Sequence, residues 1–241
     1  FSLVALVVVL AVLLFLRPLL ALVPMAALGA IVIYAALRLI DIGEFQRMLR
    51  FKPSEFRLAL ITVAGVVFTD ILMGVALAVA LSVIDLFARL MRPNDAVMGE
   101  VPNLAGLHDV RDWEGATTIP GLLIYRYDAP LCFANAENFR SRALAAIEAE
   151  ATPVRWFVLN AEAIVEIDIT AADAVQELQQ SLATRGIVFA LARVKQDLYR
   201  QLVRAGLVER IGAQWFFPTL PTAVAAFTAR TDAGTPRKPA P

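Results

Sequence analysis

The feature that most constrains the fold is a series of long apolar runs at the start of the chain. They occupy residues 1–16, 19–40 and 58–87, and charged residues return at ordinary density only from Arg92 onward. A membrane-spanning helix needs about 20 consecutive apolar residues, so runs of this kind are typical of such helices. We therefore predict a transmembrane region over 1–91, followed by a globular domain. Because the chain begins inside an apolar run, we expect it to be the tail of a longer protein.

The basic residues predict the orientation of the transmembrane region. They cluster between the second and third runs and again after the third run, at Arg38, Arg47, Arg50, Lys52, Arg57, Arg89 and Arg92. Positively charged loops are retained on the cytoplasmic side of a membrane. We therefore expect both clusters and the globular domain in the cytoplasm, and the corner at Arg17 and Pro18 on the opposite side.

The third run, at 58–87, predicts a helical hairpin. Its length corresponds to about 45 Å of helix, which is too long for one span and too short for two full spans. We predict two short helices that turn at Thr69 and Asp70, either of which can cap the second helix. Gly65 and Gly74 flank this turn, where close helix packing requires small residues. The alternative for Asp70 is a role in an ion pathway, since intramembrane carboxylates are usually functional.

The second run and the segment after it predict two further helices. Pro24 suits the first turn of a helix, and residues 25–40 supply one span. Residues 42–56 carry apolar side chains on one helical face and charged ones elsewhere, which predicts an amphipathic helix on the membrane surface. Asp85 and Arg89 have the spacing of an interfacial ion pair within one helix.

The residues after the membrane region predict an α/β domain. We expect a linker at 92–119 with a first short strand at 97–101, a domain at 120–229 and a disordered tail at 230–241. Strands are expected at 122–128, 156–161, 187–192 and 215–217. Helices are expected at 135–150, from Thr170 onward, at 196–205 and at 222–229. Asn135 is expected to cap the first of these helices, and Thr170 and Asp173 have the spacing of a loose capping box at the start of the second. Alternating strands and helices predict a mixed, mostly parallel sheet.

Several functional classes find no support in the sequence. There is no nucleophile elbow and no glycine-rich phosphate loop, so we expect neither an enzyme nor a cofactor. Glu162, Glu166 and Asp168 resemble an acid/base cluster, but solvated acids near a helix start are the simpler interpretation. His108 lies in a polar linker without further ligands for a metal, so no metal site is expected. Cys132 is the only cysteine, which excludes an internal disulfide.

The net charge is zero, and no basic stretch suggests binding to nucleic acid.

Three segments of the globular part resemble the STAS domain of SulP (sulfate permease) anion transporters. They are "YDAPLCFANAENF" (127–139), "WFVLNAEAIVEIDITAADAV" (156–175) and "RGIVFALARVKQDLYRQLVRAGL" (185–207). The membrane segments "LVPMAALGAIVIYAALRLID" (22–41) and "FTDILMGVALAVALSV" (68–83) resemble the last transmembrane helices of the same family. The resemblance implies a fourteen-helix inverted-repeat transporter, of which this chain supplies the end of helix eleven and helices twelve to fourteen of the gate half.

The resemblance also implies a function and partners. The chain is then the C-terminal part of a secondary-active, sulfate-type anion transporter in the cell membrane, with a cytoplasmic STAS domain for regulation or assembly. The expected partners are the preceding helices of the same protein, the lipid bilayer, the transported anion, a second copy in a homodimer and a cytoplasmic regulator. The family's anion site lies in earlier helices, so we assign no substrate-binding residue. The alternative is a membrane-anchored STAS signalling module that binds a protein or a nucleotide.

One position carries a regulatory hypothesis from the resemblance. In anti-sigma-factor antagonists, which share the fold, a phosphorylatable serine follows an aspartate where a helix begins after a central strand. Asp168 and Thr170 occupy that place here, with Thr170 at the hydroxyl position. Phosphorylation there would add negative charge at a helix N-terminus. The simpler interpretation is that Thr170 is an ordinary N-cap.

Overall fold

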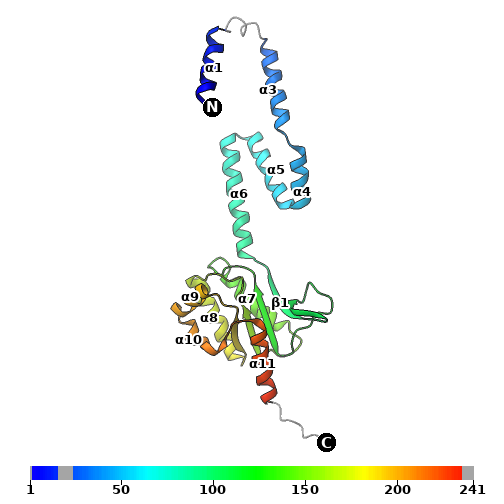
Figure 1. Cartoon of the computed structure of the whole chain (residues 1–241), viewed down its shortest axis with the longest axis vertical. Helices are drawn as coiled ribbons and strands as arrows, with labels where there is room; N and C mark the ends of the chain where they lie inside the picture. Colours follow the sequence, from blue (N-terminus) through cyan, green and yellow to red (C-terminus); the bar gives the residue numbers. More distant parts are fainter. Residues whose placement is uncertain (1, 16–23, 235–241) are drawn as a thin grey trace. The chain divides into compact units, whose positions relative to one another are not determined.

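The computed structural model describes residues 2–15 and 24–234. These residues form two compact units, Phe1–Ser82 and Val83–Pro241, and each is described by itself (Figure 1). The predicted corner at Arg17 and Pro18 and the end of the predicted tail, 235–241, lie outside the described residues.

The first unit consists of helices, all of them apolar except the amphipathic α4. They are α1 (Ser2–Phe15), α3 (Met25–Leu39), α4 (Ile42–Phe51), α5 (Pro53–Phe68) and the first part of α6 (Ile71–Met91). Two helical stretches, Met25–Phe51 and Ile71–Met91, are long and apolar enough to cross a membrane. Pro24 occupies the N-cap of α3, one position before the first turn in which we predicted it.

The predicted turn between α5 and α6 is confirmed, but the two helices are longer than expected. α5 begins at Pro53, and α6 continues to Met91, beyond the end of the apolar run. Its 21 residues correspond to about 31 Å, enough to cross the hydrocarbon core, so the expectation of two short helices is wrong for α6. The reason is that a helix continues through charged residues when they pair along it, as Asp85 and Arg89 do at 2.6 Å.

The amphipathic helix also differs from its prediction. α4 ends at Phe51 because Lys52 is extended, with φ −151°, and Pro53 starts α5. The helix therefore does not reach residue 56. Phe56 lies on α5 and packs edge-to-face against Phe45, with ring centroids 6.3 Å apart. Part of the face that we assigned to the membrane surface is thus packed against the next helix.

The second unit contains a six-stranded sheet in the order β2-β1-β3-β4-β5-β6. Its strands are β1 (Asp95–Val101), β2 (Leu104–Asp109), β3 (Leu122–Tyr127), β4 (Trp156–Asn160), β5 (Val188–Ala192) and β6 (Phe216–Phe217). β3 to β6 are parallel, and β1 is antiparallel to both of its neighbours. The predicted mixed, mostly parallel sheet is confirmed.

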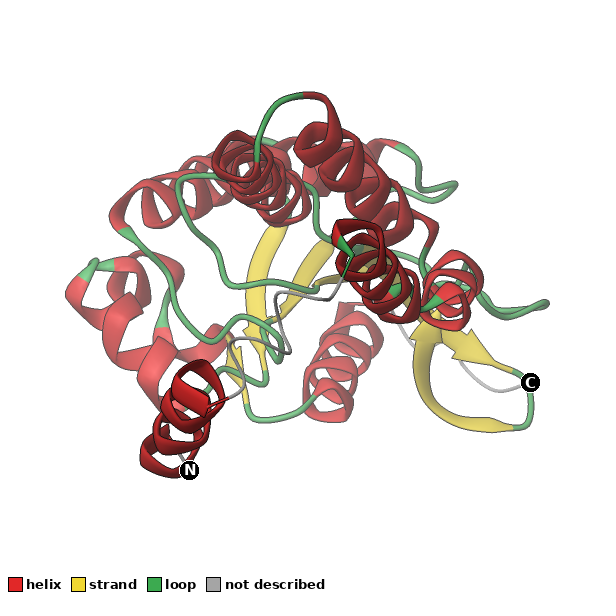
Figure 2. Ribbon diagram, turned by 90° about the horizontal axis from the view of Figure 1, so that it is seen from above, coloured by secondary structure: helices red, strands yellow, loops and turns green. Residues whose placement is uncertain are grey.

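The predicted linker at 92–119 is largely part of this sheet. It contains two strands instead of one, and β1 and β2 form a hairpin at the edge of the sheet (Figure 2). The hairpin turns at Pro102 and Asn103, and Asn103 has a positive φ of 63°. Asparagine adopts this left-handed conformation more readily than most residues. Asn103 is therefore a local signal for the turn, which the prediction of a linker did not use.

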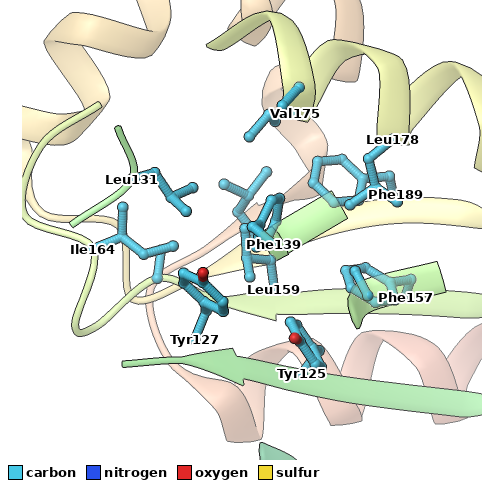
Figure 3. Close-up of a cluster of buried hydrophobic side chains, with 14 of the residues drawn as sticks. Tyr125, Tyr127, Leu131, Phe139, Phe157, Leu159, Ile164, Val175, Leu178 and Phe189 are labelled. Atoms are coloured by element: carbon cyan, nitrogen blue, oxygen red, sulfur yellow. The ribbon is translucent and has the colours of Figure 1, made fainter. Parts of the chain in front are cut away.

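Helices cover both faces of the sheet, because side chains alternate between its faces along each strand. α7 (Ala136–Glu148), α8 (Ile169–Thr184), α9 (Gln196–Arg204) and α10 (Leu207–Ile211) contribute to the larger core. Figure 3 shows Tyr125, Tyr127, Phe139 and Phe157 within it. The smaller core, on the other face, contains Phe227 of α11 (Leu220–Gly234).

The last helix extends further than predicted. We expected disorder from residue 230, whereas α11 continues to Gly234. The Arg230 guanidinium lies 4.3 Å from the centre of the Trp215 ring, and the Thr231 hydroxyl donates to the Phe227 carbonyl at 3.0 Å. These contacts hold the final turns of α11 although the segment has no apolar pattern.

Candidate functional site

The candidate regulatory position lies where the loops after β3 and β4 meet at the start of α8. The Asp168 carboxylate accepts a hydrogen bond from Ala171 N at 2.8 Å and another from Phe133 N at 2.7 Å. The backbone adds bonds between Leu131 and both Glu166 and Asp168. Asp168 therefore caps α8 and at the same time fastens the neighbouring loop to it.

The expectation that Thr170 is an N-cap is wrong. Asp168 occupies the N-cap of α8, and Thr170 is the second residue of the helix, with an exposed side chain. A capping box between Thr170 and Asp173 is therefore not formed. Asp168 is the N-cap in place of Thr170 because its carboxylate accepts hydrogen bonds from two backbone amides at once.

Two apolar side chains surround this position at the surface. Phe133 is 68% exposed and Ile169 is 83% exposed, and both belong to the segments that Asp168 joins. Exposed apolar side chains that lie together are a feature of surfaces that contact other molecules. Sequence reasoning missed Phe133 because its motif was used only to recognise the domain.

Two of the three carboxylates that resembled an acid/base cluster have structural partners. Glu162 forms an ion pair with Arg193 at 2.6 Å, and both oxygens of Asp168 accept backbone hydrogen bonds. Over the described ranges, no group of three or more metal-ligating side chains comes together. His108 lies against the Trp113 ring, with centroids 5.5 Å apart.

A charged cluster around the buried side chain of Asp95, which the sequence did not predict, lies at the start of β1. The Asp95 carboxylate accepts hydrogen bonds from the Tyr125 hydroxyl at 2.7 Å and from Arg142 Nε at 3.0 Å, and Arg142 Nη2 also donates to it. Arg111 adds a bond to the Asp95 carbonyl and an ion pair with Asp109 at 3.1 Å. Three elements, β1, β3 and α7, are therefore joined at one carboxylate.

The electrostatics of this cluster keep the carboxylate charged. Burial alone raises the pKa of Asp95, but hydrogen bonds from Arg142 and Tyr125 outweigh it and hold the pKa below 3.8. Burial also raises the pKa of the Tyr125 hydroxyl, and the hydrogen bond to Asp95 raises it further. The tyrosine thus stays protonated and acts as a donor.

Asn135 has a different role from the predicted one. It stands at the N-cap of α7, but its side chain makes no capping hydrogen bond. Its oxygen instead accepts from Cys132 N at 2.9 Å, and its amide donates to the carbonyls of Pro130 and Leu90 at 3.0 and 3.2 Å. The fully buried Asn135 therefore attaches the end of α6 to the loop after β3.

Asp70 forms the capping hydrogen bond expected at the hairpin turn. Its Oδ1 accepts from Met73 N at 2.9 Å, and the Thr69 hydroxyl donates to the Gly65 carbonyl at 2.7 Å. Gly74 is buried against Val66 on α5. A Cβ atom on Gly65 would lie 3.6 Å from Gly74 Cα, so Gly65 and Gly74 leave room for the facing helix backbone.

Comparison with protein families shows what kind of chain carries these sites. The STAS domain matches residues 115–223, and the sulfate permease family matches residues 1–62, in the order that the resemblance implied. The chain belongs to the sulfate permease family. Its globular unit is the STAS domain of a protein from this family, which consists of membrane transporters and not of enzymes.

Individual relatives of this sulfate permease chain carry related names. It is 54% identical over 230 residues to a probable sulfate transporter of Mycobacterium tuberculosis, a match that covers 95% of this chain and 41% of the relative. It is 30% identical over 223 residues to sulfate transporter 3.1 of Arabidopsis thaliana, covering 89% of this chain and 34% of the relative. The chain thus spans about two fifths or less of the length of these curated relatives.

A solved structure shares the fold of this sulfate permease chain. The murine Solute Carrier 26 family member A9 anion transporter, in its inward-facing state, matches with a TM-score of 0.73 at 22% identity. The match covers 86% of this chain and 34% of that chain. The predicted combination of transporter helices with an α/β STAS domain is therefore confirmed as a fold.

Proposed function

We propose that this chain forms the last membrane helices and the cytoplasmic STAS domain of a secondary-active transporter for sulfate or a similar inorganic anion. The observation that carries the proposal is the 54% identity to the probable sulfate transporter of Mycobacterium tuberculosis, because it extends over 95% of the chain and includes both units. The activity belongs to a longer protein, since the match covers only 41% of that relative.

Within such a transporter, the chain contributes scaffold, dimer contacts and regulatory input. The substrate site lies in helices that precede this chain, and transport proceeds by alternating access. The basic residues from Arg38 to Arg57 and from Arg89 to Arg92 support a cytoplasmic position for the STAS domain. A homodimer in the cell membrane is part of the same proposal.

Sulfate uptake tests this proposal directly. The whole reading frame that contains this chain is expressed and reconstituted into liposomes, and uptake of radiolabelled sulfate is measured. We expect uptake by the whole protein and only the level of empty liposomes for residues 1–241 alone, because the substrate site is outside them. A folded whole protein that moves neither sulfate nor bicarbonate would refute the proposal.

A second candidate is a membrane-anchored STAS signalling module. The exposed side chains of Phe133 and Ile169 around Asp168 favour it, because they offer an apolar contact surface beside the hydroxyl of Thr170. In this proposal a protein regulator binds there, and phosphate on Thr170 changes its binding. Mass spectrometry of the protein purified from its own cells tests for phosphate on Thr170, and a consistently unmodified residue would contradict the switch.

For Asp70 we propose a capping role and not a place in an ion pathway. The support is the hydrogen bond from Met73 N, which an asparagine side chain can also accept. We expect Asp70→Asn to retain sulfate uptake in the whole protein and Asp70→Ala to lower hairpin stability by about 1 kcal/mol. Loss of uptake in a folded Asp70→Asn protein would assign the carboxylate to an ion pathway.

A further inference from the structure

The STAS domain holds two adjoining pockets around the Asp95 cluster. Asp95, Arg111 and Arg142 line both of them. The first pocket, of about 240 Å³, is completed by Arg92, Pro93, Asn94 and Asn138. The second, of about 260 Å³, is completed by small apolar side chains, Ala96, Val97, Val110, Ala145 and Ala146. The two pockets therefore form a charged half and an apolar half, which share the side chains of Asp95, Arg111 and Arg142 as a common wall.

Positive charge exceeds negative charge in the polar half. Arg92 follows α6, Arg111 follows β2 and Arg142 lies on α7, so three guanidinium groups arrive from separate elements. The carboxylates of Asp95 and Asp109 balance two of them. Arg92 has no ion pair within residues 24–234, so one positive charge is left over.

The pocket also retains hydrogen-bond donors. The side chains of Arg111 and Arg142 are 57% and 50% exposed, although each is bound to a carboxylate. A guanidinium has five N–H groups, and Arg142 uses only those of Nε and Nη2 on Asp95. The Asn138 oxygen accepts from the Tyr127 hydroxyl at 3.1 Å, which leaves its amide group to donate.

We propose that this pocket binds a phosphate group carried by a molecule with a short apolar part. Guanidinium groups recognise phosphate through paired hydrogen bonds, and donors from three directions suit an anion with more oxygens than a carboxylate has. The apolar half, lined by Val97 and Val110, receives the carbon part of the ligand. The proposal does not depend on sulfate transport.

The phosphate group has two sources with the same chemistry. Arg92 directly follows Met91, the last residue of a helix that is long and apolar enough to cross a membrane. Phospholipid headgroups lie at the ends of such helices, so a lipid phosphate is one source. A soluble phosphate ester is the other.

Binding of inorganic phosphate to the full chain tests the site. The chain is dissolved in dodecyl maltoside, a detergent without phosphate, and inorganic phosphate is titrated calorimetrically at low ionic strength. We expect binding by the wild-type chain and about tenfold weaker binding by Arg92→Gln, because one charged donor is lost. The matched control is Arg204→Gln, which removes an exposed positive charge elsewhere in the domain and should leave the affinity unchanged.

The possible outcomes distinguish a specific phosphate-binding site from nonspecific electrostatic attraction of phosphate to the domain. No binding by the wild-type chain, or equal weakening in both variants, would overturn the proposal. Arg92 makes no ion pair inside the described domain, so tryptophan fluorescence should show wild-type folding of Arg92→Gln. The titration is then repeated in nanodiscs of phosphatidylcholine, whose headgroup carries a phosphate but no net charge. Weaker phosphate binding there identifies the lipid headgroup as the ligand, and unchanged binding identifies a soluble phosphate.

Discussion

Replacing Asp95 by alanine is expected to lower the free energy of unfolding of the STAS domain by about 3 kcal/mol. The change leaves the buried Tyr125 hydroxyl without its acceptor and Arg142 without its carboxylate. All three tryptophans of the chain, Trp113, Trp156 and Trp215, lie in this domain. Denaturant unfolding followed by tryptophan fluorescence therefore reports on the domain in the full chain.

The same carboxylate predicts a dependence of stability on pH. Its pKa in the folded protein is lower than the ordinary 3.8 that we assign to the unfolded chain. The charged form therefore stabilises the fold above that unfolded value, and this stabilisation is lost as the pH falls through the folded pKa. The free energy of unfolding should therefore fall less steeply with acidification in Asp95→Ala than in the wild-type chain. Denaturant unfolding of both proteins at several pH values below neutrality measures this difference.

Two controls make the Asp95 prediction specific. Asp173→Ala removes an exposed carboxylate from α8 and should change the free energy of unfolding by no more than about 0.5 kcal/mol. Tyr125→Phe removes only one donor and should cost about 1 kcal/mol. If Asp95→Ala were no more destabilising than Asp173→Ala, the Asp95 carboxylate would not hold β1, β3 and α7 together.

Replacing Gly74 by leucine is expected to destabilise the α5–α6 hairpin by about 3 kcal/mol. A Cβ atom at this position would lie 2.3 Å from Val66 Cγ2 and 2.7 Å from Val66 N. The second contact is with backbone, so the side chain of Val66 cannot relieve it by rotating. The helices must move apart, and thermal unfolding of the full chain in detergent, followed by circular dichroism, measures the loss.

Gly29 provides the matched control for this substitution. It also lies within an apolar helix, α3, but a Cβ atom there would meet nothing within 4 Å. Leucine is a better helix former than glycine by about 1 kcal/mol, so Gly29→Leu should leave stability unchanged or raise it. Equal destabilisation by both variants would mean that crowding against Val66 is not the cause.

Much of the fold was predictable because it depends on neighbours in the chain. The turn at Thr69 and Asp70 follows from the length of one apolar run and from capping residues within it. The alternation of buried strands with amphipathic helices between residues 120 and 229 predicts the mixed, mostly parallel sheet. The β1–β2 hairpin was not predicted, because the turn at Asn103 lies within the segment that we expected to be a linker.

The candidate sites were less predictable, and Asp168 shows why. Its place before a helix indicates a cap, but Thr170 is an equally good cap by residue type. What decides between them is the amide of Phe133, which belongs to another loop 35 residues away and binds the same carboxylate. Asn135 is a similar case, because its side-chain amide donates a hydrogen bond to the carbonyl of Leu90, 45 residues away.

The sequence by itself determined the membrane and globular parts, their order, the hairpin turn and the family. Each of these is recorded in local composition, in spacing or in long similar segments, and none requires a distant contact. Only the tertiary structure brought Asp95 to Arg142, 47 residues away, and to Tyr125, 30 residues away. The pocket around them exists only after β1, β3 and α7 have packed, since no local pattern marks residues whose partners are chosen by the fold.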